Sequence, residues 1–135
     1  MMGNTAKQPD GKAQAVVLIA DDEQMICEMA SVALRLDGYL ILTACDGQDA
    51  VEISEKHSGP IDLFITDVRM PLMDGNQAVA RITAQRNGIK ILLMSGYPLP
   101  ENDGNTFSFL PKPFTASDLR DKVREVLSKQ TKTAC

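Results

Sequence analysis

Five short apolar runs recur along the chain, separated by longer stretches of mixed apolar and polar residues. The runs are rich in Val, Ile, Leu and Phe and have Gly, Pro or Asp near their ends. This pattern is typical of strands that are buried on both faces. The expected strands cover residues 16–20, 40–45, 61–66, 89–94 and 107–110.

The stretches between these runs have the spacing of amphipathic helices. Between residues 26 and 34, apolar side chains recur three, four, seven and eight positions apart, which predicts a helix with one buried face. Gly38 follows as the residue expected to end that helix. Thr115 and Asp118 have the spacing of a capping box at the start of the last helix. Further helices are expected around residues 50–53 and over residues 77–84 and 119–127.

Alternating strands and helices predict an α/β fold with a doubly wound, five-stranded parallel sheet, because each helix returns the chain to the same end of the sheet. Residues 97–106 depart from this rhythm, since they contain two Pro, one Gly and two Asn. We expect a loop or one helical turn there, so that the fourth helix of the fold is short or absent. Residues 15–127 are expected to form one domain between flexible tails at 1–14 and 128–135.

Composition narrows the class of protein. The chain has 135 residues, 44% apolar and 24% charged, enough for a core that needs neither a metal nor disulfides. The net charge is −4 and the Lys and Arg residues are scattered, which argues against direct nucleic-acid binding. No apolar run approaches the roughly 20 residues of a membrane span, and residues 1–14 lack an apolar signal segment. We therefore expect a cytoplasmic protein without membrane contact.

The cysteines and the single histidine do not indicate a metal site. Cys27, Cys45 and Cys135 lie far apart, with no CxxC pair and no Cys/His cluster, so the usual zinc sites are excluded. The thiols are expected to be reduced. His57 is expected to lie at a helix end and to have no catalytic role.

Polar side chains follow four of the five expected strands: Asp21 and Asp22, then Asp67, Ser95 and Lys112. In open α/β sheets the ligand site lies at the carboxyl ends of the strands. If the first and third strands are neighbours, about 4.8 Å apart, three carboxylates share one pocket and repel one another unless a cation intervenes. Lys112 and a divalent metal are the candidate cations. Oxygen-only ligands favour Mg²⁺, which commonly also binds phosphate oxygens.

Four short motifs stand at these strand ends in order along the chain. They are Asp21-Asp22-Glu23, the run DVRMPLMDG over residues 67–75, Ser95-Gly96, and Lys112-Pro113-Phe114. Together they resemble the receiver domain of bacterial response regulators, and the resemblance covers residues 15–127. It implies a flavodoxin-like sheet with the strand order 2-1-3-4-5.

The resemblance also implies a chemistry. Asp67 matches the aspartate that accepts a phosphoryl group from a phosphohistidine on a histidine kinase or a histidine phosphotransfer domain. Mg²⁺ is the implied cofactor, bound by Asp22, Asp67 and the backbone carbonyl of Arg69, while Asp21 orients a metal-bound water. The chain would then be a signalling phosphoacceptor, not an enzyme.

Three further positions carry implied roles. Ser95 matches a hydroxyl that hydrogen-bonds a phosphoryl oxygen, and Lys112 matches the cation that pairs with that group. Phe109 matches the switch aromatic that responds through Ser95, although it lacks the hydroxyl of a tyrosine. We expect a weak homodimer at most.

Two other functions stay open. An aspartyl-phosphate phosphohydrolase would also use Asp67 as its nucleophile, but such enzymes commonly have a second Asp two positions later, where this chain has Arg69. A degenerate receiver would act only as an interaction module, and the retention of all five site positions counts against it. The motifs SGYP and FLPKPF resemble receivers at the end of hybrid sensor kinases, while a stand-alone receiver is the alternative.

Overall fold

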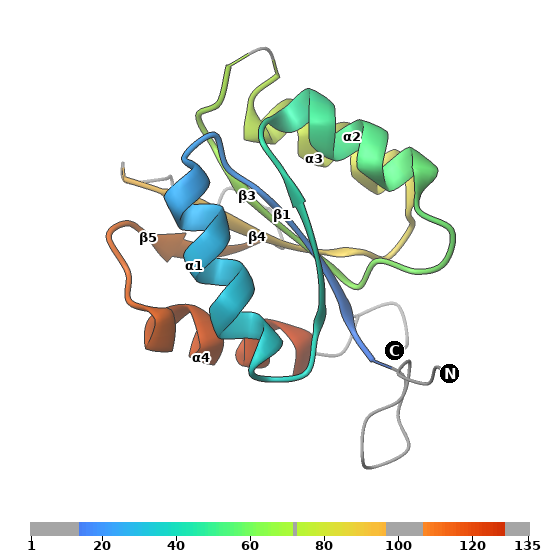
Figure 1. The fold of residues 1–135 in the computed structure, drawn as a ribbon. Coiled ribbons are helices and arrows are strands. Elements are labelled where there is room, and N and C mark those ends of the chain that lie inside the picture. The colour runs from blue at the N-terminus through green and yellow to red at the C-terminus, as the bar shows by residue number, and fades with distance from the viewer. Residues whose placement is uncertain (1–13, 72, 97–106, 129–135) are drawn as a thin grey trace.

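The computed structural model describes residues 14–71, 73–96 and 107–128. Within them, five strands and four helices follow one another along the chain (Figure 1). The strands are β1 (Val16–Ala20), β2 (Leu40–Ala44), β3 (Leu63–Asp67), β4 (Lys90–Ser95) and β5 (Ser108–Pro111). The helices are α1 (Gln24–Arg35), α2 (Gly47–Lys56), α3 (Gly75–Gln85) and α4 (Ala116–Ser128). None of these four helices is long and apolar enough to cross a membrane.

The sheet is parallel throughout, with the order β2-β1-β3-β4-β5. The predicted fold class and strand order are therefore confirmed. Helices α1 and α4 cover one face of the sheet, and α2 and α3 cover the other (Figure 1). The predicted loop or helical turn at 97–106 lies outside the described residues.

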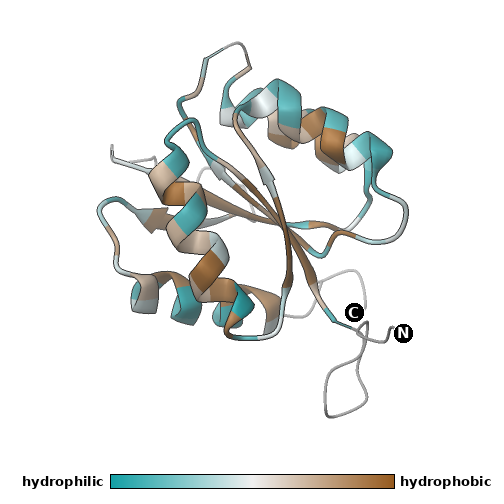
Figure 2. Ribbon diagram, viewed as in Figure 1, coloured by the Kyte–Doolittle hydropathy of each residue, from teal (hydrophilic) through white to brown (hydrophobic). Residues whose placement is uncertain are grey.

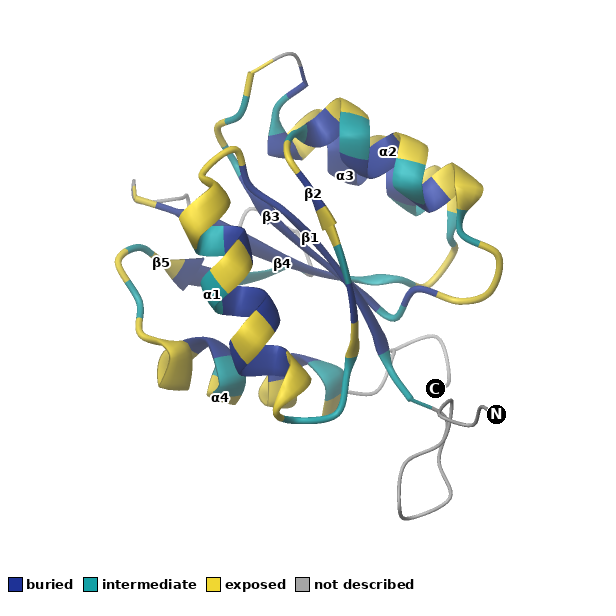
Figure 3. Ribbon diagram, in the orientation of Figure 1, coloured by how far each residue is buried: buried dark blue, intermediate teal, exposed yellow. Residues whose placement is uncertain are grey.

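Each strand supplies side chains to two separate cores. On β1, Val16, Leu18 and Ala20 pack on the side of α2 and α3, whereas Val17 and Ile19 pack on the side of α1 and α4, because successive side chains of a strand point to opposite faces. The strands are accordingly apolar, while the helices carry polar residues on their outer sides (Figure 2). The strands and the inner sides of the helices are mostly buried, and the outer sides of the helices are exposed (Figure 3).

Several strand bounds differ from the prediction by one or two residues. Strand β3 begins at Leu63 instead of residue 61, because the Asp62 carboxylate accepts the Val16 N–H (2.8 Å) in place of a backbone carbonyl. Strands β3, β4 and β5 each extend one residue beyond the predicted end, and β2 ends one residue before it. As a result Asp67 and Ser95 are the last residues of strands instead of the first residues of loops.

Side-chain caps fix where the helices begin. The Asp46 carboxylate accepts a backbone N–H from the first turn of α2 (2.8 Å), which starts that helix earlier than predicted. Asp74 and Gln77 form a reciprocal capping box that does the same for α3. The capping box predicted for the last helix is confirmed, since Thr115 and Asp118 each accept the other's backbone N–H at 3.0 Å.

The end of α1 is tied to α4 by an ion pair. The helix cap is Leu36, so the predicted position of Gly38 directly after the cap is wrong by one residue; Asp37 stands there, and Gly38 follows with φ 91°. The Asp37 carboxylate accepts two hydrogen bonds from the Arg120 guanidinium (2.6 and 3.1 Å). These bonds hold the pKa of the Asp37 carboxyl below its usual value.

Replacing Asp37 with Asn is expected to lower the urea midpoint of unfolding at neutral pH, because Arg120 loses its bidentate partner. The pKa of Asp37 is lower in the folded chain, so the stabilisation is present above the unfolded value of about 3.9 and is lost as the pH falls further. The difference between wild type and variant should therefore shrink in acid. Asp121→Asn, in an exposed pair with Arg124, is the control; an equal effect there would contradict this account.

Candidate functional site

Three carboxylates meet at the carboxyl ends of two neighbouring strands. Asp21 and Asp22 directly follow β1, and Asp67 ends β3. The two strands pair with Ala20 opposite Thr66, so the residues that follow them reach the same edge of the sheet. One oxygen from each acid lies within 4.8 Å of the other two. We call these three residues the acidic pocket; its assembly agrees with the sequence prediction.

The donor set of the acidic pocket fits a small, hard divalent cation. One oxygen from each acid lies within 4.8 Å of the other two, so small side-chain movements would bring all three within the bond length of about 2.1 Å that Mg²⁺ requires. Asp21 and Asp67 are buried and Asp22 is exposed, so the pocket opens to solvent beside Asp22. Such a half-open, oxygen-only site suits an ion that keeps several of its waters.

Lys112 supplies the positive charge that the pocket needs. Its Nζ lies 3.0 Å from Asp21 Oδ2, 3.3 Å from Asp67 Oδ2 and 3.4 Å from Glu23 Oε1. The ammonium reaches across the sheet from the loop after β5, where the Lys112–Pro113 peptide bond is cis. The predicted reach of this lysine to Asp67 is confirmed by a direct ion pair.

Asp21 is held more tightly than its two neighbours. One carboxylate oxygen accepts the Glu23 N–H (2.8 Å), and the other accepts a hydrogen bond from Lys112. Burial raises the pKa of Asp21, and these two hydrogen bonds only partly oppose it. Burial acts to lower the pKa of Lys112, but Asp21 and Asp67 outweigh it and raise that pKa. Lys112 therefore stays a cation in the pocket.

Ser95 lies on β4, the strand next to that of Asp67, and Phe109 lies on β5, one strand further away. Ser95 is buried at the end of β4, and its backbone carbonyl accepts the Lys112 N–H (2.8 Å). Phe109 on β5 pairs in register with Leu93 on β4, and it packs, half-buried, on the side of α2 and α3. The side chain of Arg69 is exposed in the loop that follows Asp67. The proposed roles of these residues remain predictions.

The loop after Asp67 is fixed by close backbone packing. The Gly75 N–H donates to the Val68 carbonyl (2.9 Å), and a Cβ on Gly75 would overlap the carbonyl oxygen of Asp67. Two residues before Gly75, the carbonyl oxygen of Met73 would be overlapped by a Cβ on Gly47, the first residue of α2. The sequence suggested only a turn and a helix entry at Asp74-Gly75, so this packing function was missed.

Glu23 is the other participant that the sequence analysis did not assign. It belongs to the acidic motif after β1, but its partner Lys112 stands 89 positions later. The acidic character of the motif was the available signal, and only the fold shows which cation it meets.

The family model described as the response regulator receiver domain matches residues 17–124. Among curated relatives, the chain is 35% identical over 129 residues to the sensor kinase CckA of Brucella abortus. It is 39% identical over 118 residues to the transcriptional regulatory protein PdtaR of Mycobacterium tuberculosis. These matches cover 92% and 84% of this chain but only 14% and 57% of the two relatives, so the chain spans part of their length.

Solved structures of receivers are similar to this chain in both fold and sequence. The chemotaxis protein CheY4 of Vibrio cholerae superposes with a TM-score of 0.76 at 31% identity, over 84% of this chain and 99% of that one. The receiver domain of the hybrid histidine kinase CckA superposes with a TM-score of 0.74 at 33% identity, over 84% of this chain and 100% of that one.

Replacing Gly75 with Ala should lower the free energy of unfolding by about 1–3 kcal/mol, because the added methyl group meets backbone that cannot rotate away. Amide shifts at Asp67 and Val68 should change with it. Gly96→Ala is the matched control, since a Cβ there meets nothing within 4 Å. Equal effects of the two substitutions on urea unfolding would show that Gly75 is not needed for close packing.

Proposed function

Because this chain belongs to the response regulator receiver domain family, we propose that it is the phosphoacceptor module of a two-component phosphorelay, phosphorylated on Asp67. The observation that carries the proposal is the position of Asp67. Its carboxylate lies within 4.8 Å of two other acids and is paired with Lys112 at 3.3 Å. An aspartate at the end of a buried strand, facing a cation and open to solvent on one side, suits an anionic group that arrives from outside.

The transfer itself needs little from the protein beyond placement and charge. A carboxylate oxygen of Asp67 attacks the phosphorus of a phosphohistidine while the phosphorus–nitrogen bond breaks. The electron pair of that bond stays on the imidazole nitrogen, and an acyl phosphate forms on Asp67. The proposed nucleophile is a carboxylate and not a hydroxyl group, so this step requires no general base.

Mg²⁺ is the proposed cofactor, and the residues that would hold it are Asp22, Asp67 and the backbone carbonyl of Arg69. When bound, it would offset the negative charge of the acids and of the incoming phosphoryl oxygens. Asp21 is proposed to hold a metal-bound water, which agrees with the way Glu23 and Lys112 fix its carboxylate. The open side at Asp22 supports access from solvent.

Lys112 and Ser95 are proposed to contact the phosphoryl group. An ammonium has three N–H donors, and three carboxylates lie within 3.4 Å of Lys112 Nζ. A phosphoryl group on Asp67 would compete for these donors with Glu23, whose side chain is exposed and readily replaced as a partner. Ser95 would donate its hydroxyl from the neighbouring strand β4.

The signal is proposed to pass from Ser95 to Phe109. When Ser95 turns toward the phosphoryl oxygens, the space behind β4 favours an inward position of Phe109, which is half-buried on the adjacent strand. A charge added at Asp67 thereby becomes a change in packing at β5.

The proposed partner is a histidine kinase or a histidine phosphotransfer domain. Membership of the receiver family supports this class of partner. The similarity to sensor kinase CckA, and to the receiver domain of a hybrid histidine kinase, supports a receiver that acts within or beside such a kinase.

Asp67 should gain one phosphoryl group when the chain is incubated with acetyl phosphate and Mg²⁺, as read by intact mass. Asp67→Asn should show no gain, and chelation with EDTA should suppress the reaction in wild type. Asp121→Asn, which removes an exposed carboxylate on α4, is the control and should react normally. The same mass gain in Asp67→Asn, or an equal gain in EDTA, would contradict the proposal that Asp67 is a Mg²⁺-dependent phosphoacceptor.

Mg²⁺ should stabilise the fold by reducing repulsion among the three acids. At ten times its Kd, an ion that binds only the folded state contributes about 1.4 kcal/mol. Asp22→Asn should raise the melting temperature of the metal-free protein and weaken its response to Mg²⁺, whereas exposed Glu52→Gln should change neither. A metal-free Asp22→Asn protein that is less stable and responds normally would exclude a metal site here.

A further inference from the structure

One polar side chain is fully buried next to the acidic pocket and has no part in the proposed function. Thr66 stands on β3 directly before Asp67, and it is 0% exposed. Every other residue of β3 before Asp67 is apolar, and a valine would have the same shape as the threonine. A buried hydroxyl is unfavourable unless it forms a hydrogen bond. The contacts of this hydroxyl therefore indicate why the strand contains it.

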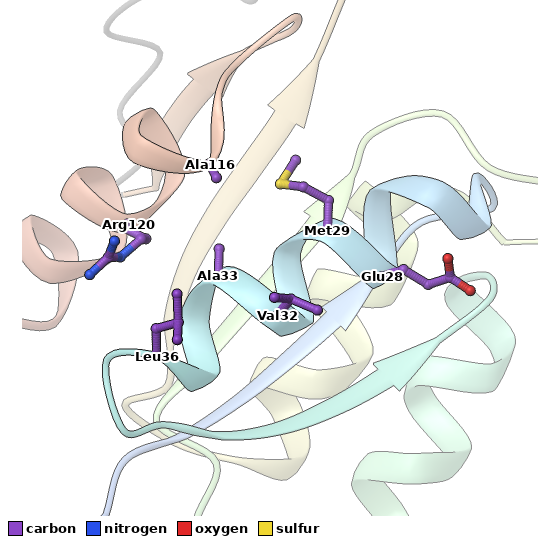
Figure 4. A pocket seen from close by; sticks show the side chains of 7 residues that line it. All are labelled: Glu28, Met29, Val32, Ala33, Leu36, Ala116 and Arg120. Atoms are coloured by element: carbon purple, nitrogen blue, oxygen red, sulfur yellow. The ribbon is translucent and has the colours of Figure 1, made fainter.

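Two surface grooves of the described chain leave Thr66 out. The groove between α1 and α4 (Figure 4) is lined by residues of those two helices and by Leu36. The groove beside α3 is lined by Gln48, Met73, Gln77, Ala80 and Arg81. Because Thr66 is buried and lines neither groove, its hydroxyl acts through other residues of its own chain.

The Thr66 hydroxyl fixes the peptide group that follows Asp67. Its Oγ1 donates a hydrogen bond to the Asp67 carbonyl oxygen at 2.9 Å. The N–H of the same peptide group, which belongs to Val68, donates to the Met94 carbonyl on β4 at 3.1 Å. Both polar atoms of this peptide group are thus hydrogen-bonded, so its plane has little freedom to rotate.

This hydrogen bond lies where the pairing between β1 and β3 stops. The last registered pair of the two strands is Ala20 with Thr66, one residue before Asp67. Strand β1 ends there, and the Thr66 side chain supplies a donor to the next carbonyl. Gly75 packs against the same carbonyl oxygen. The Asp67 carbonyl is therefore held by one side chain and by one close backbone contact.

The same hydroxyl also contacts the loop beyond Arg69. Thr66 Oγ1 lies 4.0 Å from Met70 Sδ, and Met70 is partly buried against the core on the side of α2 and α3. A hydroxyl has one hydrogen to donate, which goes to the nearer Asp67 carbonyl, so the sulfur contact is one of packing. Arg69 thus lies on a short segment whose two ends, Asp67 and Met70, both contact Thr66.

We propose that Thr66 is a positioning residue for the acidic pocket. It holds the segment from Asp67 to Met70 in the conformation that presents the Arg69 carbonyl to a divalent cation. This inference rests on the proposed function, because the Arg69 carbonyl is a proposed ligand of Mg²⁺. It adds a residue that touches neither the metal nor the phosphoryl group and acts through the backbone.

Titration of the full chain with Mg²⁺, followed by amide chemical shifts, tests the proposal. Thr66→Val keeps the shape of the side chain but removes the hydroxyl, and it should weaken Mg²⁺ binding about tenfold, as the loss of a residue behind a metal ligand commonly does. Thr66→Ser retains the hydroxyl and should bind Mg²⁺ nearly as wild type does. Thr83→Val is the matched control, because the Thr83 hydroxyl also donates to a backbone carbonyl, that of Val79 within α3 (2.8 Å).

Two further measurements separate positioning from stability. In the metal-free protein, the carbonyl carbon shift of Asp67 should change in Thr66→Val and return in Thr66→Ser, because this shift responds to the hydrogen bond that the oxygen accepts. Urea unfolding of each variant establishes that it is folded under the conditions of the titration. If Thr66→Val does not fold, Thr66→Cys takes its place beside Thr66→Ser, since a thiol is similar in size to a hydroxyl but a weak donor.

Unchanged Mg²⁺ binding in a folded Thr66→Val protein would overturn the proposal, as would a wild type that binds no Mg²⁺. So would a Thr66→Ser protein that binds as weakly as Thr66→Val, or an equal loss in Thr83→Val, because the loss would then not come from the contact with Asp67. A wild type that binds Mg²⁺ but gains no phosphoryl group from acetyl phosphate would contradict the phosphoacceptor role and leave the result for Thr66 unaffected.

Discussion

The arrangement of the site depends on one electrostatic constraint. The carboxylates of Asp21, Glu23 and Asp67 all pair with a single ammonium, that of Lys112. Asp21 and Asp67 are buried, and buried like charges are costly unless an opposite charge is close. Lys112 meets both at 3.3 Å or less, although it comes from the opposite end of the sequence. The order of the strands, the loop after β5 and the end of β1 all have to be correct for this contact to form.

The fold was largely predictable because the sheet is buried on both faces. Residues 16–20 have no polar position, and β1 has the predicted bounds because both of its sides enter a core. The helix starts were less predictable. Asp46 and Asp74 are polar residues whose role becomes visible only once their side chains meet the backbone of the following turn.

The site was predictable to the extent that its residues stand at strand ends. Asp21, Asp22, Asp67 and Lys112 could be brought together from strand position alone, because the carboxyl ends of parallel strands share an edge. Contacts between residues far apart in sequence could not be predicted in this way. The pairing of Glu23 with Lys112 and the approach of Gly75 to Asp67 depend on positions in space that no local pattern records.

The two glycines that pack against the loop after Asp67 have a consequence for the energetics of the proposed reaction. Gly75 packs against the carbonyl of Asp67 and so holds the two ends of the loop together, and Gly47 packs against the carbonyl of Met73. The conformational entropy lost in placing the Asp67 carboxylate, which we propose as the phosphoacceptor, is therefore lost when the chain folds and not when a phosphoryl donor arrives. The activation free energy of phosphoryl transfer to Asp67 would then include little entropy cost for ordering this backbone. It would come mainly from the movement of charge and the exchange of bonds at phosphorus.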